Sequence, residues 1–152
     1  MGDVDCWLHP EVEVRTSEIA GRGLFATADL PARTVVWRLS GAPLDDEGRL
    51  VLAPGDVRFV NHSCDADLGW VDDHSLAVMT DVAAGVELVT DYALSTVEPD
   101  WFLRCHCPSY RCRQMVEGTD WRIPQLQQRY AGHWAPAVQK LIDSETPTKS
   151  QS

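Results

Sequence analysis

The stretch Arg-Phe-Val-Asn-His-Ser-Cys, residues 58–64, decides the fold together with a Cys-x-Cys-x4-Cys cluster at Cys105, Cys107 and Cys112. The later cluster supplies three thiols, whereas a tetrahedral structural metal site takes four ligands. Cys64, at the end of the earlier stretch, can supply the fourth. A metal held by all four thiols would tie a polar Asn-His-Ser turn to the C-terminal part of the chain, and we expect a site where the two meet.

Length and composition predict one domain with its own hydrophobic core, since the chain has 152 residues. The sequence lacks an apolar run long enough for a transmembrane helix. The N-terminus, Met-Gly-Asp-Val-Asp-Cys, has neither the basic start nor the apolar run of a secretory signal. We therefore expect a cytoplasmic protein, or a nuclear one in a eukaryote, that is not secreted. Its cysteines should be reduced thiols that bind a metal rather than form disulfides.

The formal net charge of −10 argues against direct nucleic-acid binding, which normally requires a basic face. An acidic protein attracts partners rich in Lys and Arg, because opposite charges speed encounter. Solubility alone explains the charge equally well.

Short strands dominate the pattern of the first hundred or so residues. Apolar and polar residues alternate over 11–17, and β-branched or aromatic residues fill 33–39. Residues 75–80 and 86–90 are further strand candidates, whereas 41–56 is expected to be a loop with one short strand near 50–52.

Helices are expected only after the cysteines. Pro124 suits the first position of a helix that runs to about Tyr130, and Pro136 that of a second one through about Ile142. Apolar side chains at three- to four-residue steps indicate a packing face: Trp121, Leu126, Tyr130, Trp134, Val138 and Leu141. These helices either cap the sheet or form a wall of a substrate groove. The polar residues 144–152 are expected to be disordered.

Four segments in a fixed order carry a resemblance to a known family. They are Gly-Arg-Gly-Leu-Phe-Ala at 21–26, the stretch 58–64, Glu-Leu-Val-Thr-Asp-Tyr at 87–92, and Cys105-His106-Cys107 followed by Cys112-Arg113. Together they resemble the SET-domain protein-lysine methyltransferases, including the cysteine-rich post-SET segment, over roughly residues 11–118.

The resemblance implies a mainly β, β-clip-like SET fold with a pseudoknot where the Asn-His-Ser turn and the tyrosine segment cross. It places the SET domain at 11–118, with a zinc-bound post-SET segment at about 101–118. A helical extension at 119–143 and the tail at 144–152 would follow. The implied partner is a basic, lysine-containing protein or peptide, with no nucleic acid and no membrane. We expect a monomer.

The resemblance also implies the site. Tyr92 would be the catalytic residue, and structural zinc would be held by Cys64, Cys105, Cys107 and Cys112. S-adenosylmethionine would contact Gly21, Arg22, Gly23, Leu24, Arg58, Asn61, His62, Tyr92 and Met115. The implied activity is transfer of a methyl group from this cofactor to a lysine side chain of a protein.

Other interpretations stay open for each of these residues. Tyr92 can be a strand tyrosine packed on the core, and Asn61 can cap a turn. The cysteines can be free thiols or belong to an unrelated zinc loop. Thr90 and the stretch Leu39-Ser40-Gly41-Ala42 depart from the family pattern. These departures keep open a catalytically degenerate domain that binds cofactor or peptide, and a zinc-dependent interaction module is a third possibility.

Overall fold

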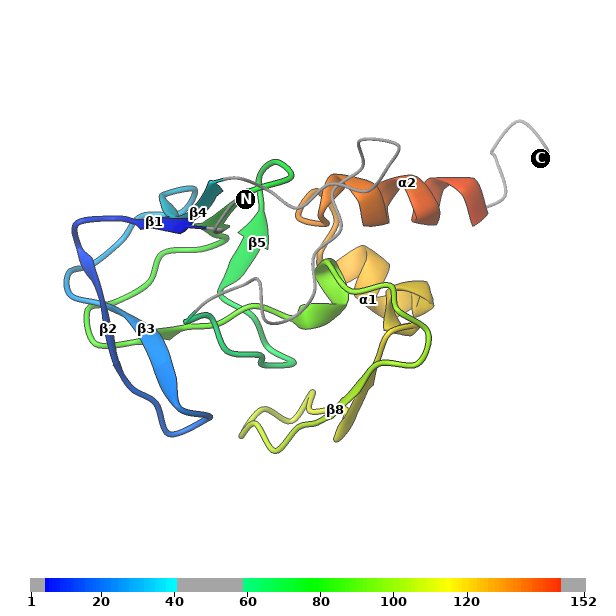
Figure 1. Cartoon of the computed structure of the whole chain (residues 1–152), viewed down its shortest axis with the longest axis horizontal. Coiled ribbons are helices and arrows are strands. Elements are labelled where there is room, and N and C mark those ends of the chain that lie inside the picture. The colour runs from blue at the N-terminus through cyan, green and yellow to red at the C-terminus, as the bar shows by residue number, and fades with distance from the viewer. Residues whose placement is uncertain (1–4, 41–58, 146–152) are drawn as a thin grey trace.

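The structure, a computed structural model, describes residues 5–40 and 59–145 (Figure 1). Arg58, the short strand predicted near 50–52 and the departure at Gly41-Ala42 lie outside the described residues. Within the described part of the chain, no helix is both long and apolar enough to cross a lipid bilayer.

Short antiparallel strands form three sheets, so the expectation of a mainly β fold with few helices is confirmed. The strands are β1 (Asp5–Leu8), β2 (Val12–Thr16), β3 (Arg22–Ala26), β4 (Val35–Ser40), β5 (Leu68–Trp70), β6 (Ser75–Val78), β7 (Glu87–Leu88), β8 (Phe102–Arg104) and β9 (Met115–Glu117). One sheet has the order β1-β4-β6-β5, the second the order β2-β3-β7, and β8 pairs with β9 alone.

The four strands predicted from sequence correspond to β2, β4, β6 and β7. Four short strands, β1, β5, β8 and β9, were not predicted, because each has only three or four residues. β1 pairs with β4 from Asp5↔Ser40 to Leu8↔Trp37, so the fold begins before residue 11. β5 contains a glycine and has only three residues, and its pairing with β6 (Leu68↔Val78 through Trp70↔Leu76) holds it in the sheet.

One hydrophobic core joins the two larger sheets to the C-terminal helices. Trp37 on β4 and Trp70 on β5 are buried and meet edge to face with ring centroids 5.9 Å apart. The helices α1 (Pro124–Arg129) and α2 (Pro136–Glu145) lie beside the sheets (Figure 1). They follow the 3-10 turn η3 (Asp120–Arg122) and contribute to the same core.

The predicted helical face is confirmed except at one position. Leu141 is 38% exposed, and Ile142, one turn after Val138, is buried instead. α2 also continues to Glu145, so residues 144 and 145, predicted to belong to a disordered tail, are helical.

Segments 60–64 and 88–92 lie side by side, although they are far apart in the sequence. The Thr90 N–H donates to the Asn61 carbonyl at 3.1 Å, and the Ser63 N–H donates to the Thr90 carbonyl at 3.1 Å. The resulting bridge between His62 and Thr90 is parallel. The polar turn and the tyrosine segment are therefore neighbours, and the fold places a candidate site between them.

Candidate functional site

Four cysteines come together as the spacing predicted. The sulfur atoms of Cys64, Cys105, Cys107 and Cys112 all lie within 4.8 Å of one another, and none is in a disulfide. The Cys64 and Cys105 sulfurs are 3.9 Å apart. Tetrahedral zinc with Zn–S bonds of about 2.3 Å places sulfurs roughly 3.8 Å apart, so these side chains fit a metal of that kind.

The β8–β9 pair carries three of the four thiols. We call residues 101–118 the cysteine hairpin. Cys105 follows β8, and its N–H donates to the Gln114 carbonyl at 2.8 Å just before β9. Cys64 comes from the polar turn and is fully buried. The cluster therefore joins the hairpin to the segment that also contacts Tyr92.

Burial governs the ionisation of these thiols. It raises the pKa of Cys64 and that of Cys105. Burial also opposes ionisation of Cys107, but backbone hydrogen bonds at Cys64 and Ser109 outweigh it and lower the Cys107 pKa to about 7. Because metal ligands must be thiolates, binding of a metal here would release protons.

Asn61 connects the polar turn to the loop between β2 and β3. Its side-chain nitrogen lies 3.1 Å from the Ala20 carbonyl, 3.2 Å from the Arg22 carbonyl and 2.9 Å from Glu87 Oε2. It is also 3.1 Å from the Ser17 hydroxyl, which donates to the same Glu87 carboxylate at 2.9 Å. The amide therefore caps the glycine turn, a structural role that the sequence had left open.

Glycine occupies positions 21 and 23 of this turn for two different physical reasons. Gly21 has φ +44°, a left-handed conformation that glycine adopts without steric cost. A Cβ on Gly23 would overlap the Glu87 carboxylate, so glycine leaves room for that side chain in its observed position. Leu24 is fully buried in the core, so its side chain serves packing.

Tyr92 begins the 3-10 turn η2 (Tyr92–Leu94) rather than ending a strand. Its hydroxyl donates to the Val60 carbonyl at 2.7 Å, and its N–H donates to His62 Nδ1 at 3.0 Å. The Tyr92 ring meets the His62 ring edge to face, with centroids 5.3 Å apart. It also contacts the tilted Trp101 ring, with centroids 6.2 Å apart. Burial raises the pKa of the phenol to about 12, so Tyr92 is neutral at physiological pH.

His62 is buried and neutral between Tyr92 and the cysteines. Burial lowers its pKa to about 4, although the Asp91 carboxylate acts in the opposite direction. Because Nδ1 accepts from the Tyr92 N–H, the proton must sit on Nε2. Nε2 lies 3.5 Å from the Cys64 sulfur, which can accept that hydrogen.

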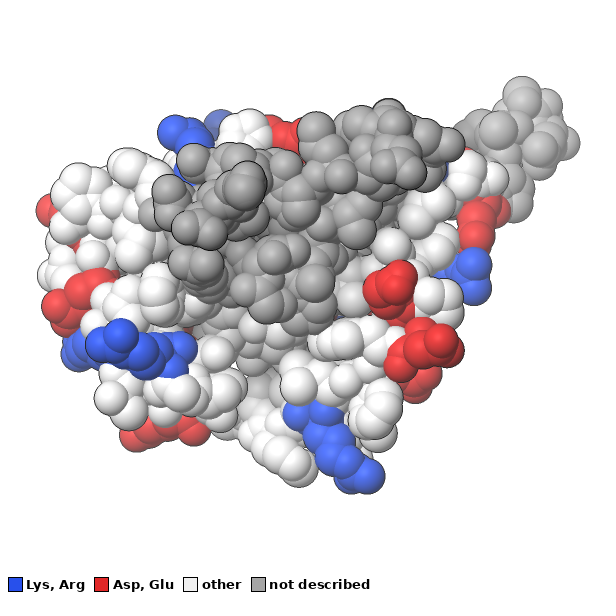
Figure 2. Space-filling view, in the orientation of Figure 1, with Lys and Arg blue, Asp and Glu red and all other residues white. Residues whose placement is uncertain are grey.

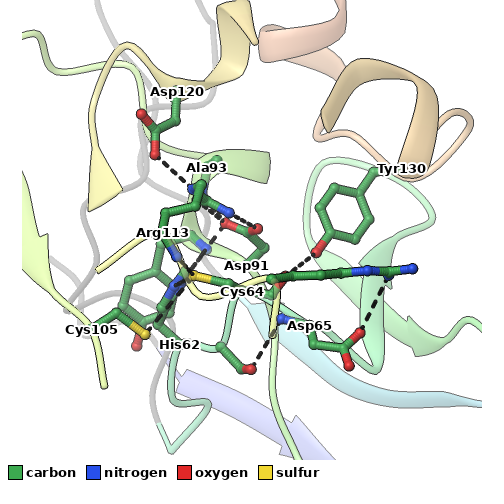
Figure 3. A network of polar contacts seen from close by, with 12 residues as sticks. His62, Cys64, Asp65, Asp91, Ala93, Cys105, Arg113, Asp120 and Tyr130 are labelled. Carbon is green, nitrogen blue, oxygen red and sulfur yellow. Dashed lines mark hydrogen bonds and ion pairs between the residues drawn. The ribbon is translucent and has the colours of Figure 1, made fainter. Parts of the chain in front are cut away.

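An ion-pair network that sequence reasoning missed lies beside these residues (Figure 3). Arg113 donates from Nη1 and Nη2 to the two oxygens of Asp91, at 2.8 and 2.9 Å. Its Nε donates to Asp120 at 3.0 Å. The sequence shows Asp91 and Arg113 only as members of two motifs, because no spacing rule relates residues so far apart.

The remaining predicted residues occupy different positions around the site. Arg22 is exposed at the start of β3, and Met115 is partly buried at the start of β9. β9 packs against η2, the turn that begins at Tyr92, so Met115 belongs to a strand that contacts this turn. The structure therefore assembles the glycine turn, Asn61, His62 and Tyr92 in one region.

Comparison with known proteins gives one curated relative and no matching family model. The relative is an H3 lysine-9-specific histone-lysine N-methyltransferase from Fusarium mangiferae, 33% identical over 98 residues. The alignment covers 52% of this chain and 28% of the relative, so this chain corresponds to little more than a quarter of that protein. The similarity supports a relationship to lysine methyltransferases over about half of the chain.

Proposed function

We propose that this protein transfers a methyl group from S-adenosylmethionine to a lysine side chain of a protein substrate. The observation that carries the proposal is the position of segment 60–62. Asn61 holds the glycine turn on one side, and on the other Val60 and His62 both accept hydrogen bonds from Tyr92. The lysine methyltransferase activity of the Fusarium relative supports the same chemistry.

The residues present suit the cofactor. S-adenosylmethionine, when bound, supplies a methyl group on a sulfonium cation and carries a carboxylate. Exposed Arg22, whose carbonyl is fixed by Asn61, offers a cation for a carboxylate. The Tyr92 and Trp101 rings, 6.2 Å apart between centroids, offer faces whose negative potential suits a cationic group. We infer that backbone groups of Gly21, Gly23 and His62, with Arg58 and Met115, complete the cofactor contacts.

Tyr92 acts through its hydroxyl oxygen. The hydroxyl proton is donated to the Val60 carbonyl, which leaves the oxygen lone pairs free to accept a hydrogen from the substrate amine. Because burial raises the pKa of the phenol to about 12, Tyr92 orients the amine as a fixed dipole and does not act as a base. Positioning of this kind can lower a barrier by about 7–11 kcal/mol in favourable cases.

A lysine substrate is expected to approach an acidic surface. Acidic side chains outnumber basic ones 23 to 13 in the chain, and several face the viewer in Figure 2 among the described residues. Glu98 and Asp100 are exposed next to Trp101, which contacts Tyr92. Burial of the amine beside the reacting centre would then favour its neutral form.

The metal has a structural role in this proposal. Four thiolates select zinc and leave no open position for a reactant, so the ion would fix the cysteine hairpin against segment 60–64. We further propose that the parallel pairing of segments 60–64 and 88–92 belongs to a SET-type pseudoknot. The SET domain would span residues 11–118, and β1 adds a strand to its sheet before residue 11.

A methyl-transfer assay tests the proposal. The purified protein is mixed with radiolabelled S-adenosylmethionine and a set of basic proteins, including histone H3. We expect label in lysine, and we expect Tyr92→Phe to lower the rate about a hundredfold or more. Tyr110→Phe is the matched control, because the Tyr110 side chain is 89% exposed and the same atom is removed there.

The outcomes separate the possible functions. Equal rates for Tyr92→Phe and wild type would remove the assigned role of Tyr92. Cofactor binding by calorimetry without any transfer would favour a degenerate binding domain. No heat from folded, zinc-loaded protein would favour an interaction module without a cofactor.

A further inference from the structure

We propose that Arg113 is a positioning residue for Tyr92, and that it sets the Tyr92 turn relative to the cysteine cluster. The inference rests on the proposed function in so far as Tyr92 orients a substrate amine. Its structural part, that Arg113 controls where Tyr92 sits, can be tested without any substrate.

The contacts of Arg113 reach three separate parts of the chain. Its guanidinium donates to both oxygens of Asp91 and to Asp120, and its backbone N–H donates to the Cys64 sulfur at 3.3 Å. It follows Cys112 directly in the sequence. One side chain therefore fixes the tyrosine segment to the cysteine hairpin and to the start of the C-terminal extension (Figure 3).

Asp91 passes this constraint to Tyr92. The Asp91 side chain is fully buried, and it accepts from the Ala93 N–H at 3.0 Å, which caps the turn that begins at Tyr92. The same carboxylate lies 3.8 Å from His62 Nδ1, the atom that accepts from the Tyr92 N–H. A buried carboxylate needs a paired cation, and the bound Arg113 fork fixes the orientation of the cap.

The geometry requires arginine rather than any cation. Three guanidinium nitrogens donate to three oxygens on two carboxylates, at 2.8 to 3.0 Å. A planar fork can do this, whereas a lysine ammonium is a point charge without that fixed geometry. Arg113→Lys therefore keeps a positive charge beside Asp91 but no longer fixes the orientation of the Asp91 carboxylate.

The test compares three variants of the zinc-loaded, 152-residue chain. Arg113→Lys removes the fork, and Asp120→Asn weakens only the contact to Nε. Arg122→Lys is the matched control, because Arg122 makes the same kind of two-point contact with Glu145 at 2.9 and 3.1 Å on the surface. We expect Arg113→Lys to lower kcat about 10- to 100-fold with a KM change below about threefold, since small misplacement of a reacting group has this effect. Asp120→Asn should lower kcat by a few-fold, and Arg122→Lys should leave it unchanged.

A spectroscopic readout isolates Tyr92 from general stability. The chain has three tyrosines, so fluorotyrosine labelling gives three fluorine signals, and Tyr92→Phe identifies the one from Tyr92. We expect Arg113→Lys and Asp120→Asn to shift the Tyr92 signal, with the signals of Tyr110 and Tyr130 in place and one zinc per chain retained.

An unshifted Tyr92 signal together with wild-type kcat in both variants would overturn the proposal while the enzymatic function stood. If no substrate is methylated by wild type, a shifted signal still supports control of Tyr92 by Arg113, and only the proposed function fails. Should Arg113→Lys not fold, Asp120→Asn decides the matter. It keeps a cation on Asp91 but weakens the contact that holds the guanidinium from its Nε side. A shifted Tyr92 signal would then support the proposal, and an unshifted one would overturn it.

Discussion

The sheets and the cysteine hairpin are stabilised by different physical forces. The sheets and C-terminal helices share one continuous hydrophobic core that includes Trp37, Leu76 and Trp121. Among the described residues, the hairpin has a separate cluster whose buried members are Cys64, Cys105 and Val116, with Trp101 and Leu103 partly buried against it. Such a small cluster gains little from apolar burial. The hairpin must therefore depend on polar links, namely the four thiols and the Arg113 network.

This difference separates folding from site assembly. We expect the core to form whether or not a metal is present, and we expect a metal on the thiols to place the part of the site that contains Trp101 and Arg113. A change in the core should act on the whole molecule, and a change in the hairpin should act locally on Tyr92.

Metal removal should give the largest difference between the two regions. Chelation would remove the metal ion that Cys64, Cys105, Cys107 and Cys112 share. In small zinc-binding peptides, structural zinc contributes about 10–16 kcal/mol to the free energy of folding. We expect amide hydrogen exchange to accelerate strongly between β8 and β9, for example at Cys105, while β4 and β6 stay protected. Equal loss of protection in both regions would contradict the separation, and unchanged exchange would contradict the metal site.

Truncation of a core aromatic should destabilise the sheets and leave zinc binding by the cysteine hairpin unchanged. Trp37 is fully buried against Trp70, and its indole nitrogen has no hydrogen-bond partner among the described residues, so Trp37→Ala removes mainly packing. We expect about 3–5 kcal/mol lower stability by urea unfolding. Zinc content per folded chain should not change. Loss of zinc at urea concentrations where the sheets remain folded would show that the two regions are coupled more tightly than proposed.

A carboxylate just before β5 should contribute to the pH dependence of stability. Asp67 is half-buried next to Val89, and burial raises its pKa to about 6, with a further contribution from Asp65. The folded state therefore holds a proton that the unfolded chain releases near pH 3.8. This contribution to stability is present below about pH 4 and is lost as the pH rises through about 6.

Asp67→Asn should remove that dependence. With partial exposure taken into account, we expect the variant to be about 1–2 kcal/mol more stable than wild type at pH 7.5. The two should have similar stability near pH 4, as measured by urea unfolding at both pH values. Asp100→Asn, at an exposed position, serves as the control and should leave the profile unchanged. A variant no more stable than wild type at pH 7.5 would contradict the assignment.

The sequence predicts those parts of the molecule that depend on chemistry or on local pattern. The thiol cluster was predictable because few residue types bind zinc, and the helices because proline starts them at Pro124 and Pro136. The turn at Tyr92 was also accessible in principle, since Asp91 is a favourable cap residue. The Arg113 network was not, because its members are brought together only by the tertiary fold. Leu24 shows the same limit, since a motif position cannot reveal which side chain packs inward.

The smallest effect should come from an exposed pair that resembles the Arg113 network in geometry. Arg122 and Glu145 join η3 to the end of α2 through two hydrogen bonds, but their side chains are about half exposed, at 55% and 46%. Water and salt screen such a pair, so Arg122→Gln should lower stability by less than about 1 kcal/mol. We expect urea unfolding to show this small loss at low ionic strength and almost none in 1 M salt. A loss of several kcal/mol that persists in salt would mean that the junction between η3 and α2 is stabilised as the cysteine hairpin is, by a desolvated ion pair. The division between an apolar core and a polar hairpin would then no longer describe the C-terminal extension.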